Sequence, residues 1–395
     1  MGLLDRRIRV VLAANFIAVA ARMSLVTFLG IYFVRHGIDL RLVGVAFLGE
    51  SILRGLLAPL FGAWSDRVGR RPLLVAAALA TAAVLPCFLL VRDPLELMLW
   101  SAAVGIAGAV NMPVAGALLL DLAPPERRQS TLAANYTAMS VAYTLGVMPA
   151  GYVAEQGYGL LAATSAAGFV CVALLYAIAL RGALPMERAR AESHLVADTI
   201  AAARDGAFLR FAALAFAFPL SMGLVVTVSP LFGAELGLGE GYIGLVLGGN
   251  SILVAVLAMP VAARMEAGGP FRWLGAAALF TAAAHLCYAL LPGAAAALLA
   301  GTIVFSFGEI VFSSAIPAAV ARLAPAGRRG AYQGGWTLVA SLSMGSALAL
   351  SGLLRDLMGW RAVWLAFGAV VLAAGALLFW SRRWFLDQAE RRQKA

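Results

Sequence analysis

Charged side chains inside apolar runs are the residues of this sequence whose types and spacing could do chemistry. Arg22 lies near the middle of one such run, and Glu50 and Arg54 lie four residues apart in the next. Glu309 lies in a run of the second half and has no basic residue within one helical turn along the sequence. A charge in an apolar helix is costly unless it faces a partner or a hydrated path. These four residues are therefore candidates for a binding or proton pathway.

Each of these residues also has a purely structural interpretation. Glu50 and Arg54 can meet on one helix face, either as an internal ion pair or with Glu50 binding and releasing a proton as its surroundings hydrate and dry. As a functional residue, Arg22 would contact an anionic group of a substrate or orient Glu50. As a structural residue, it would form an ion pair buried between helices. As a functional residue, Glu309 would bind a proton or a cationic ligand. As a structural residue, it would be neutral and form a hydrogen bond between helices.

Four residues in other apolar runs are further candidates to line the same pathway: Asn111, Tyr136, Asn250 and Trp336. Each is equally well explained as a contact between helices. The sequence contains no nucleotide-binding glycine loop and no catalytic triad spacing. It therefore predicts neither ATP hydrolysis nor other enzymatic chemistry.

The composition indicates whether the helices that hold these residues lie in water or in a lipid bilayer. The 395 residues are 62% hydrophobic and 13% charged, with a mean hydropathy of +0.89. A chain this apolar is an integral membrane protein. Its net charge of +10 comes from arginines between apolar runs, which favours anionic lipid headgroups over a nucleic acid as partner. The three cysteines lack the spacing of a metal site, and no metal or other cofactor is expected.

Apolar runs long enough to cross a membrane predict an all-α protein with twelve transmembrane helices. They lie at residues 8–34, 42–64, 72–91, 95–120, 130–154, 160–181, 207–233, 241–263, 272–291, 294–321, 331–353 and 361–380. The first run is too long for a signal peptide, so we interpret it as a retained span. Most of the 30 Lys and Arg residues lie in the segments on the side of the N-terminus. Both termini are therefore expected in the cytoplasm of a cell whose plasma membrane, such as the bacterial inner membrane, holds the chain.

Two short sequence matches indicate an internal repeat. Ser51-Ile52-Leu53 recurs at residues 251–253, and the segment 122–128 recurs in altered form at residues 323–329. The two offsets are nearly equal, and both matches fall at equivalent positions between spans. The sequence therefore predicts two six-helix bundles, residues 1–182 and 207–395, joined by a cytoplasmic linker at 183–206.

The residues between the second and third spans carry a family resemblance. The pattern Gly62-x-x-x-Asp66-Arg67-x-Gly69-Arg70-Arg71 closely resembles the signature loop of the major facilitator superfamily. The resemblance implies two bundles that move about a central cavity. Gly62 and Gly69 are expected to permit close backbone approach and a tight turn, while Asp66 and the arginines form a gating contact. The alternative is a loop that is merely positively charged.

The fifth span carries a second resemblance. Gly146, Pro149 and Gly151 are similar to a reduced form of the glycine–proline motif in the superfamily's twelve-span drug/proton antiporters, and the resemblance implies a gating helix. Closely spaced Gly and Pro soften a helix and let it pack tightly. The fourth span departs from the antiporter pattern because it has no arginine before Gly105. If the chain needs a positive charge equivalent to that arginine, Arg22 or Arg54 is the candidate to supply it.

Together these features predict a secondary active transporter that works by alternating access. The expected activity is proton-coupled efflux of small amphipathic molecules by a monomer embedded in lipid. The alternative within the same class is a carrier of an organic anion, amino acid, sugar or lipid, anchored by Arg22 and Arg54. A third hypothesis, from another class, is a non-transporting membrane receptor or sensor on the same scaffold.

Overall fold

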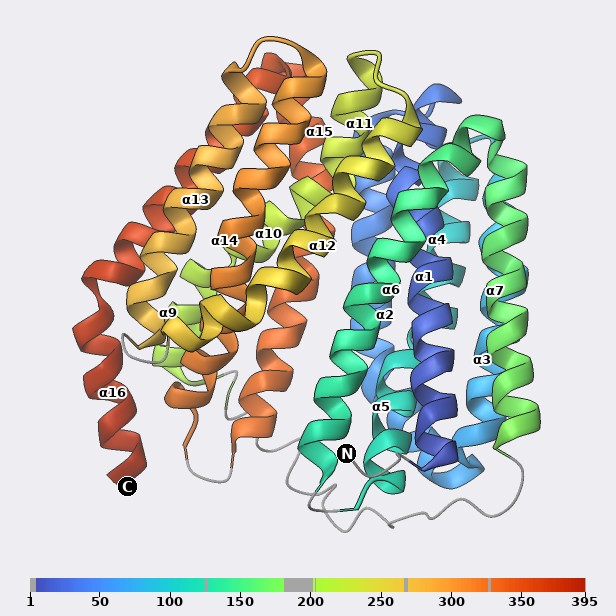
Figure 1. The fold of residues 1–395 in the computed structure, drawn as a ribbon, viewed down its shortest axis with the longest axis horizontal. Helices are drawn as coiled ribbons and strands as arrows, with labels where there is room; N and C mark the ends of the chain where they lie inside the picture. The colour runs from blue at the N-terminus through green and yellow to red at the C-terminus, as the bar shows by residue number, and fades with distance from the viewer. Residues whose placement is uncertain are drawn as a thin grey trace. The chain divides into compact units, whose positions relative to one another are not determined.

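The structure is a computed structural model that describes residues 5–124, 127–180, 202, 204–265, 269–325 and 328–394. Within these residues all regular secondary structure is helical (Figure 1). The expected linker at 183–206 lies mostly outside the described residues.

Six spans form the first half of the chain. They are α1 (Arg6–Arg35), α2 (Leu40–Val68), α3 continued by η1 (Arg70–Val84, Leu85–Leu90), α4 continued by α5 (Pro94–Gly108, Asn111–Leu122), α6 (Arg128–Gln156) and α7 (Tyr158–Ala179). Aspartates begin several of these helices because a carboxylate accepts the free N–H groups of a first turn. Asp5, Asp39 and Asp93 accept from the backbone N–H of Arg7, Arg41 and Glu96.

The second half contains the other spans. They are α9, α10, η3 and α11 in series (Gly206–Ala215, Ala217–Gly223, Leu224–Val228, Ser229–Glu235), α12 (Glu240–Met265), α13 (Pro270–Leu290), α14 (Ala294–Leu323) and α15 (Arg329–Trp380), followed by the polar helix α16 (Arg382–Lys394). A straight helix of 52 residues would be about 78 Å long, far more than the ~30 Å apolar core of a bilayer. Gly359, with φ of +78°, divides α15 into two spans at the predicted place.

The predicted fold class is confirmed. Among the described residues, ten helical segments are long and apolar enough to cross a membrane, and α15 counts once although it holds two predicted spans. The 29-residue α6, whose first half carries Asn135 and Tyr136, is not among the ten. Each of the twelve predicted apolar runs nevertheless coincides with one helix, a series of consecutive helical elements or half of α15.

The helices form two compact units. One unit lies within Met1–Ala189 together with Leu238–Ile252, and the other within Arg190–Gly237 together with Leu253–Ala395. In the first unit, α1 packs against α6 and α7, and α2 packs against α4. In the second unit, α13 packs between α14 and α15 (Figure 1). The boundary at Ile252 falls inside α12.

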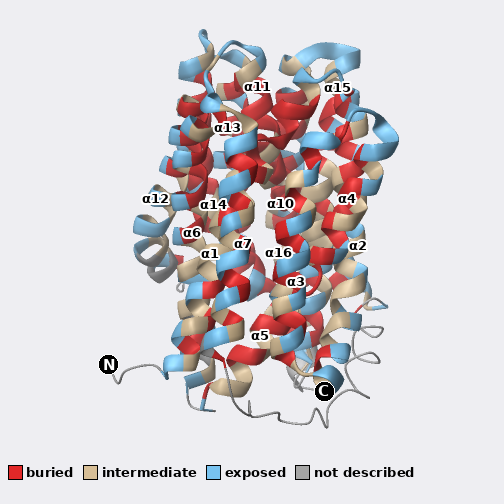
Figure 2. Cartoon of the chain, turned by 90° about the vertical axis from the view of Figure 1, so that its right-hand side faces the viewer, coloured by how far each residue is buried: buried red, intermediate tan, exposed pale blue. Residues whose placement is uncertain are grey.

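Most helices bury one side only. Figure 2 shows buried residues in red beside exposed ones in pale blue along the same helices. Many exposed positions are large and apolar, such as Leu60 (64% exposed), Leu90 (70%) and Trp380 (74%). Exposed apolar surface on this scale is what lipid-facing helices require and what soluble proteins avoid.

Candidate functional site

The first unit contains a buried cluster of three charged residues on α1 and α2, here called the arginine–glutamate cluster. Arg22 donates from Nη2 to Glu50 Oε1 at 2.6 Å, and Arg54 Nη1 lies 3.3 Å from the same oxygen. The side chains of Glu50 and Arg22 are 11% and 14% exposed, while that of Arg54 is 35% exposed. One carboxylate is thus shared by two guanidinium groups, and the cluster carries one net positive charge.

Two glycines on α4 make room for this cluster. A Cβ on Gly105 would lie 2.8 Å from the backbone oxygen of Glu50, so α2 approaches α4 closely there. A Cβ on Gly108 would lie 3.4 Å from Arg22 Nη1 and 3.7 Å from Arg54 Cδ. The i, i+3 spacing places both glycines on one face of α4. They therefore admit the α2 backbone and the two arginine side chains.

In the cluster, two positively charged arginines are attracted to one negatively charged glutamate. Burying a charge without a partner costs several kcal/mol, and Glu50 offsets that cost for both arginines at once. A proton on Glu50 would remove the negative charge and leave two like charges in one place. An external carboxylate or phosphate could instead pair with the more exposed Arg54. Proton binding and anion binding are therefore the two chemistries that this geometry allows.

The other predicted pathway residues of the first unit are placed differently. Asn111, one turn beyond Gly108, has a buried Oδ1 atom with no hydrogen-bond partner among the described residues. Tyr136 on α6 is 68% exposed, and Asn250 lies on the part of α12 that belongs to this unit. Of these three residues, Asn111 follows the two glycines beside the cluster most closely in the chain.

Glu309 and Trp336 lie in the second unit. Glu309 is half-buried on α14. Trp336 on α15 is 8% exposed and its ring centroid lies 6.2 Å from that of Phe211. Trp336 thus contacts α9 from α15.

The signature segment between α2 and α3 centres on Arg70, which is 9% exposed. Its guanidinium pairs with Asp66 at 3.2 Å and with Asp121, at the end of α5, at 2.5 Å. The neighbouring Arg71 donates to the backbone carbonyls of Tyr176 and Ala177 on α7. These contacts join the ends of α2, α3, α5 and α7 on one side of the unit.

The structure corrects the expected shape of this segment. α2 continues through Asp66 and Arg67 to Val68, so only Gly69 lies between the two helices. Gly69 has φ of +98°, a conformation that glycine adopts readily. Gly62 lies inside α2, and no other helix of the described chain comes within 4 Å of an added Cβ, so its expected role in close approach is wrong. Ala, Trp, Asp and Arg are all compatible with a helix, which explains why the turn is short.

The glycines of α6 do make close backbone contacts. A Cβ on Gly146 would lie 2.5 Å from the backbone oxygen of Ala20 on α1. A Cβ on Gly151 would overlap the backbone oxygen of Glu240 at the start of α12. Pro149 lies inside the helix between them. This arrangement gives α6 the tight packing expected for the motif.

Several residues that complete these sites were missed in the sequence. Asp121 is an acidic residue at the end of an apolar run, on the same predicted side of the membrane as Arg70, and this could have marked it as a candidate partner. Which residue it pairs with, like the contacts of Gly108 and Glu240, depends on how different spans pack.

Two units of membrane-spanning helices with a charged cluster buried inside the spans define the chain as a polytopic membrane protein. The family model described as Major Facilitator Superfamily matches residues 11–241 and 211–394, and the chain belongs to this superfamily. It is therefore an integral membrane transporter rather than an enzyme.

Three curated relatives match parts of the chain. The tetracycline resistance protein, class C, of Escherichia coli is 36% identical over 135 residues, which cover 33% of this chain and 31% of that protein. A Na(+), Li(+), K(+)/H(+) antiporter of Planococcus maritimus is 28% identical over 149 residues (36% and 34%). The major facilitator superfamily domain-containing protein 10 of Homo sapiens is 34% identical over 107 residues (27% and 23%). The chain thus spans about a third or less of the length of these relatives.

Solved structures resemble the whole fold. The nucleoside transporter NupG aligns with a TM-score of 0.77 at 13% identity, covering 96% of this chain and 100% of that one. A bacterial homologue of the human lysosomal transporter Spinster, inward-facing and occupied, gives 0.79 at 14% identity (98% and 99%). A peptide transporter, POT, in complex with sulfate gives 0.78 at 13% identity (98% and 96%). At these identities the likeness shows the fold alone.

Proposed function

We propose that this transporter exports small amphipathic molecules in exchange for protons, by alternating access. The observation that carries the proposal is the arginine–glutamate cluster. Its only carboxylate, Glu50, is 11% exposed and pairs with guanidinium groups from two helices. A charged group that is buried within a span and shared between helices can convert proton binding into helix movement.

The proposed step is a change of charge at one atom. A proton that binds Glu50 Oε1 turns two ion pairs into weaker hydrogen bonds between charged guanidinium groups and a neutral carboxyl group. Arg22 and Arg54 then repel each other, and the contact between α1 and α2 loses its main polar attraction. Release of the proton restores both ion pairs. The two protonation states therefore favour two different arrangements of these helices, which is the requirement for coupling.

The relatives support both parts of the proposal. One is an antiporter that exchanges cations for H(+), and another confers tetracycline resistance. Their alignments cover only part of each protein, so proton exchange and efflux remain proposals for this chain.

The remaining predicted residues take supporting roles in the proposal. Glu309 is a second proton-binding candidate, and Asn111, Tyr136, Asn250 and Trp336 line the pathway. Asp66, Arg70 and Asp121 form a gating contact at the ends of α2, α3 and α5, with Arg67 and Arg71 beside it. α6 is a gating helix through Gly146, Pro149 and Gly151. The working unit is a monomer in a plasma membrane, with both termini in the cytoplasm.

A second candidate function has its own observation. The cluster has two positive groups for one negative group, and Arg54 is the most exposed of the three. A substrate with a carboxylate or phosphate could pair with Arg54 without displacing Glu50. The alternative function is therefore transport of an organic anion, including an acidic lipid or amino acid.

Flux in proteoliposomes distinguishes the two functions. The probes are tetracycline, the cationic dye rhodamine 6G and the anionic dye 8-anilinonaphthalene-1-sulfonate, each measured with and without a pH gradient. Proton-coupled efflux predicts gradient-driven flux of tetracycline or the cation, lost in Glu50→Gln or Glu309→Gln. Glu96→Gln is the control because Glu96 is an exposed carboxylate in the first turn of α4. Gradient-independent flux of the anionic dye alone, lost in Arg54→Gln, would favour the alternative and refute the proposal.

A further inference from the structure

The second unit contains a pocket of about 370 Å³ at one end of its helices. The pocket lies between the end of α11, the turn from α13 to α14, and the part of α15 that follows Gly359. Every residue that lines it belongs to the second unit. In the predicted orientation these helix ends face away from the cytoplasm. The pocket is separate from the arginine–glutamate cluster, which lies in the first unit.

The buried part of the pocket wall is aromatic. Phe232 on α11 and Tyr288 on α13 are 5% and 3% exposed, and their ring centroids lie 6.3 Å apart. The Tyr288 ring stacks on Trp364 with 4.3 Å between centroids, and its hydroxyl lies 2.8 Å from Thr302 Oγ1. A Cβ on Gly301 of α14 would lie 2.7 Å from the same ring, so this glycine makes room for it. The apolar surface is thus preorganised, which lowers the cost of binding an apolar group.

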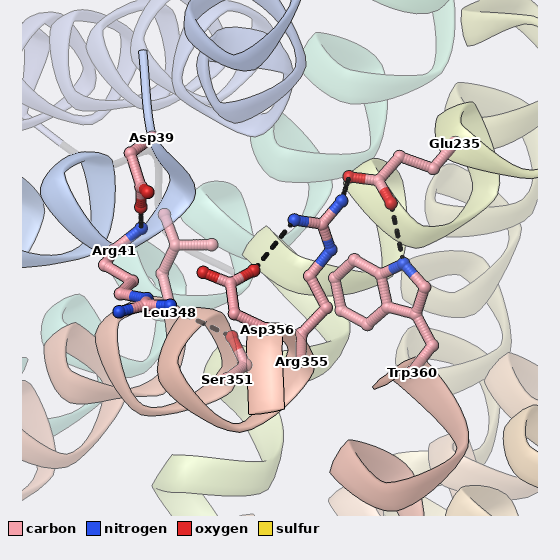
Figure 3. A network of polar contacts seen from close by, with 8 residues as sticks. All are labelled: Asp39, Arg41, Glu235, Leu348, Ser351, Arg355, Asp356 and Trp360. Atoms are coloured by element: carbon pink, nitrogen blue, oxygen red, sulfur yellow. Dashed lines mark hydrogen bonds and ion pairs between the residues drawn. The ribbon is translucent and has the colours of Figure 1, made fainter. Parts of the chain in front are cut away.

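A polar network holds the helix ends beside the pocket (Figure 3). Glu235, the last residue of α11, accepts from Arg355 Nη2 at 2.7 Å and from Trp360 Nε1 at 2.8 Å. The Trp360 ring also meets the Phe232 ring edge-on, with 5.7 Å between centroids. These contacts join α11 to α15 and fix the backbone from which the next residue, Arg361, projects.

Arg361 supplies the charge of the pocket wall. Arg355, six residues earlier, pairs with Glu235 and Asp356, whereas Arg361 is exposed and has no ion-pair partner in the described part of the chain. Gly293, the N-cap residue of α14, also lines the pocket, and no side chain caps this helix. The partial positive charge of a helix N-terminus adds to that of the guanidinium group. The pocket therefore has an apolar interior and a positive rim.

The size and position of the pocket select among anionic ligands. Pockets for small molecules have volumes of about 300–1,000 Å³. This one, at about 370 Å³, has room for a single hydrocarbon chain rather than for the two chains of a phospholipid. Leu236 and Leu291, also in its wall, are 48% and 40% exposed and continue the apolar surface outward. A chain can therefore enter from the bilayer while its acidic group stays at the membrane surface.

We propose that this pocket binds a single-chain carboxylate, such as a medium-chain fatty acid, taken from the bilayer. The carboxylate pairs with the Arg361 guanidinium group. The chain lies against Phe232, Tyr288 and Ala297, which are all buried. A bound chain contacts α11, α13, α14 and α15 together, so occupancy stabilises the second unit. Neither proton coupling nor efflux is needed for this binding, because Glu50 and the pocket lie in different units.

Photolabelling of the full-length protein in nanodiscs tests the site. The probe is dodecanoate with a diazirine at the end of its chain, and mass spectrometry maps the labelled peptides. Label is expected in residues 229–236 and 285–297, and an excess of unlabelled dodecanoate is expected to remove it. Label spread over many lipid-facing helices and unaffected by the competitor would overturn the site.

Two other competitors test the class of ligand. Dodecylamine has the same chain and the opposite charge, and it is expected to leave the label in place. Equal competition by dodecylamine and dodecanoate would overturn the assignment to a carboxylate. Naphthoate is a dissolved aromatic acid without a chain, and it is expected to compete weakly. Competition by naphthoate as strong as that by dodecanoate would overturn the bilayer as the source of the ligand.

Charge variants separate the pocket from a general attraction of fatty acids to positive charge. Arg361→Gln is expected to lower labelling at subsaturating probe about tenfold, because a hydrogen-bonded ion pair is lost. Arg361→Lys keeps the charge and is expected to retain most of the label. Arg92→Gln removes an exposed arginine of the first unit and is expected to change nothing. Labelling of Arg361→Gln equal to that of the parent would overturn the role of this arginine.

Filling the pocket is a second test, and it keeps every charge. Ala294, the first residue of α14, is half-buried and lines the pocket, so Ala294→Leu is expected to reduce labelling. Ala296→Leu is the matched control because Ala296 is exposed in the same turn and lies outside the pocket wall. Equal labelling of the two variants would overturn the pocket as the place where the chain binds.

Discussion

Gly105→Ala tests how the arginine–glutamate cluster is positioned. An added methyl carbon at this position would lie 2.8 Å from the Glu50 oxygen, 3.2 Å from its Cα and 3.3 Å from Leu53 Cβ. Ordinary contacts of this kind are several tenths of an ångström longer, so the backbone of α2 must move away from α4. Overpacking of a well-filled contact costs about 1–3 kcal/mol, and the helix preference of Ala over Gly returns only about 0.5–1 kcal/mol.

The expected net effect of Gly105→Ala is a loss of about 1–2 kcal/mol. A domain of 150–250 residues melts about 2–4 °C lower for each kcal/mol lost, which thermal unfolding of the purified protein can resolve. Displacement of Glu50 would also lengthen its 2.6 Å contact with Arg22, so pH-gradient-driven flux should fall together with stability.

Gly49→Ala is the matched control because Gly49 precedes Glu50 on α2 and no other helix of the described residues comes within 4 Å of an added Cβ. It is expected to leave transport unchanged and to stabilise the protein by about 0.5–1 kcal/mol. Equal melting temperatures for the two variants, or a Gly105→Ala protein as stable and active as the parent, would refute the proposed role of α4.

Three further substitutions test other parts of the structure. Arg70→Ala removes the ion pair between Arg70 and the buried Asp121 and should destabilise the first unit by about 3–5 kcal/mol. The additional cost of Asp121→Ala should be smaller in the double variant, and additive costs in thermal melts would contradict the pairing. Gly151→Ala should loosen α12 and accelerate its hydrogen exchange, whereas Gly159→Ala, at an open position on α7, should not; equal exchange in the two would argue against close packing. His285 is 0% exposed, and neither ring nitrogen has a hydrogen-bond partner among the described residues, so His285→Leu should leave the melting temperature unchanged or raise it; a clear fall would point to a polar contact there.

The spans could be predicted from the sequence because lipid imposes a simple rule on each of them. A helix that crosses a membrane needs a long apolar run, and the runs here are separated by short polar segments. The break in α15 at Gly359 falls in such a segment. By contrast, the end of α2 was misplaced because Asp66 and Arg67 are polar residues that remain helical. Polarity predicts where the membrane ends, not where the helix ends.

The contacts of the site could be predicted only where the partners are close in the chain. Glu50 and Arg54 were expected to meet because they are one helical turn apart, and they do. The sequence offered Glu50 as one possible partner of Arg22, but their contact depends on the relative rotation of α1 and α2. The fit of Gly105 against Glu50 depends in the same way on α2 and α4. The pairing of Arg70 with Asp121 joins residues 51 positions apart. How each helix is rotated and shifted along its axis relative to its neighbours is determined by side-chain packing. The positions of apolar runs in the sequence do not give this information.

The central claim is that Glu50 couples proton movement to transport. Its most direct test compares two fluxes of a transported probe in proteoliposomes, accumulation driven by a pH gradient and downhill equilibration without one, for the parent chain and Glu50→Gln. We predict that Glu50→Gln abolishes accumulation while downhill flux continues, because the variant keeps a polar side chain between Arg22 and Arg54 but cannot exchange a proton. Accumulation that is equal in the two proteins would contradict the account.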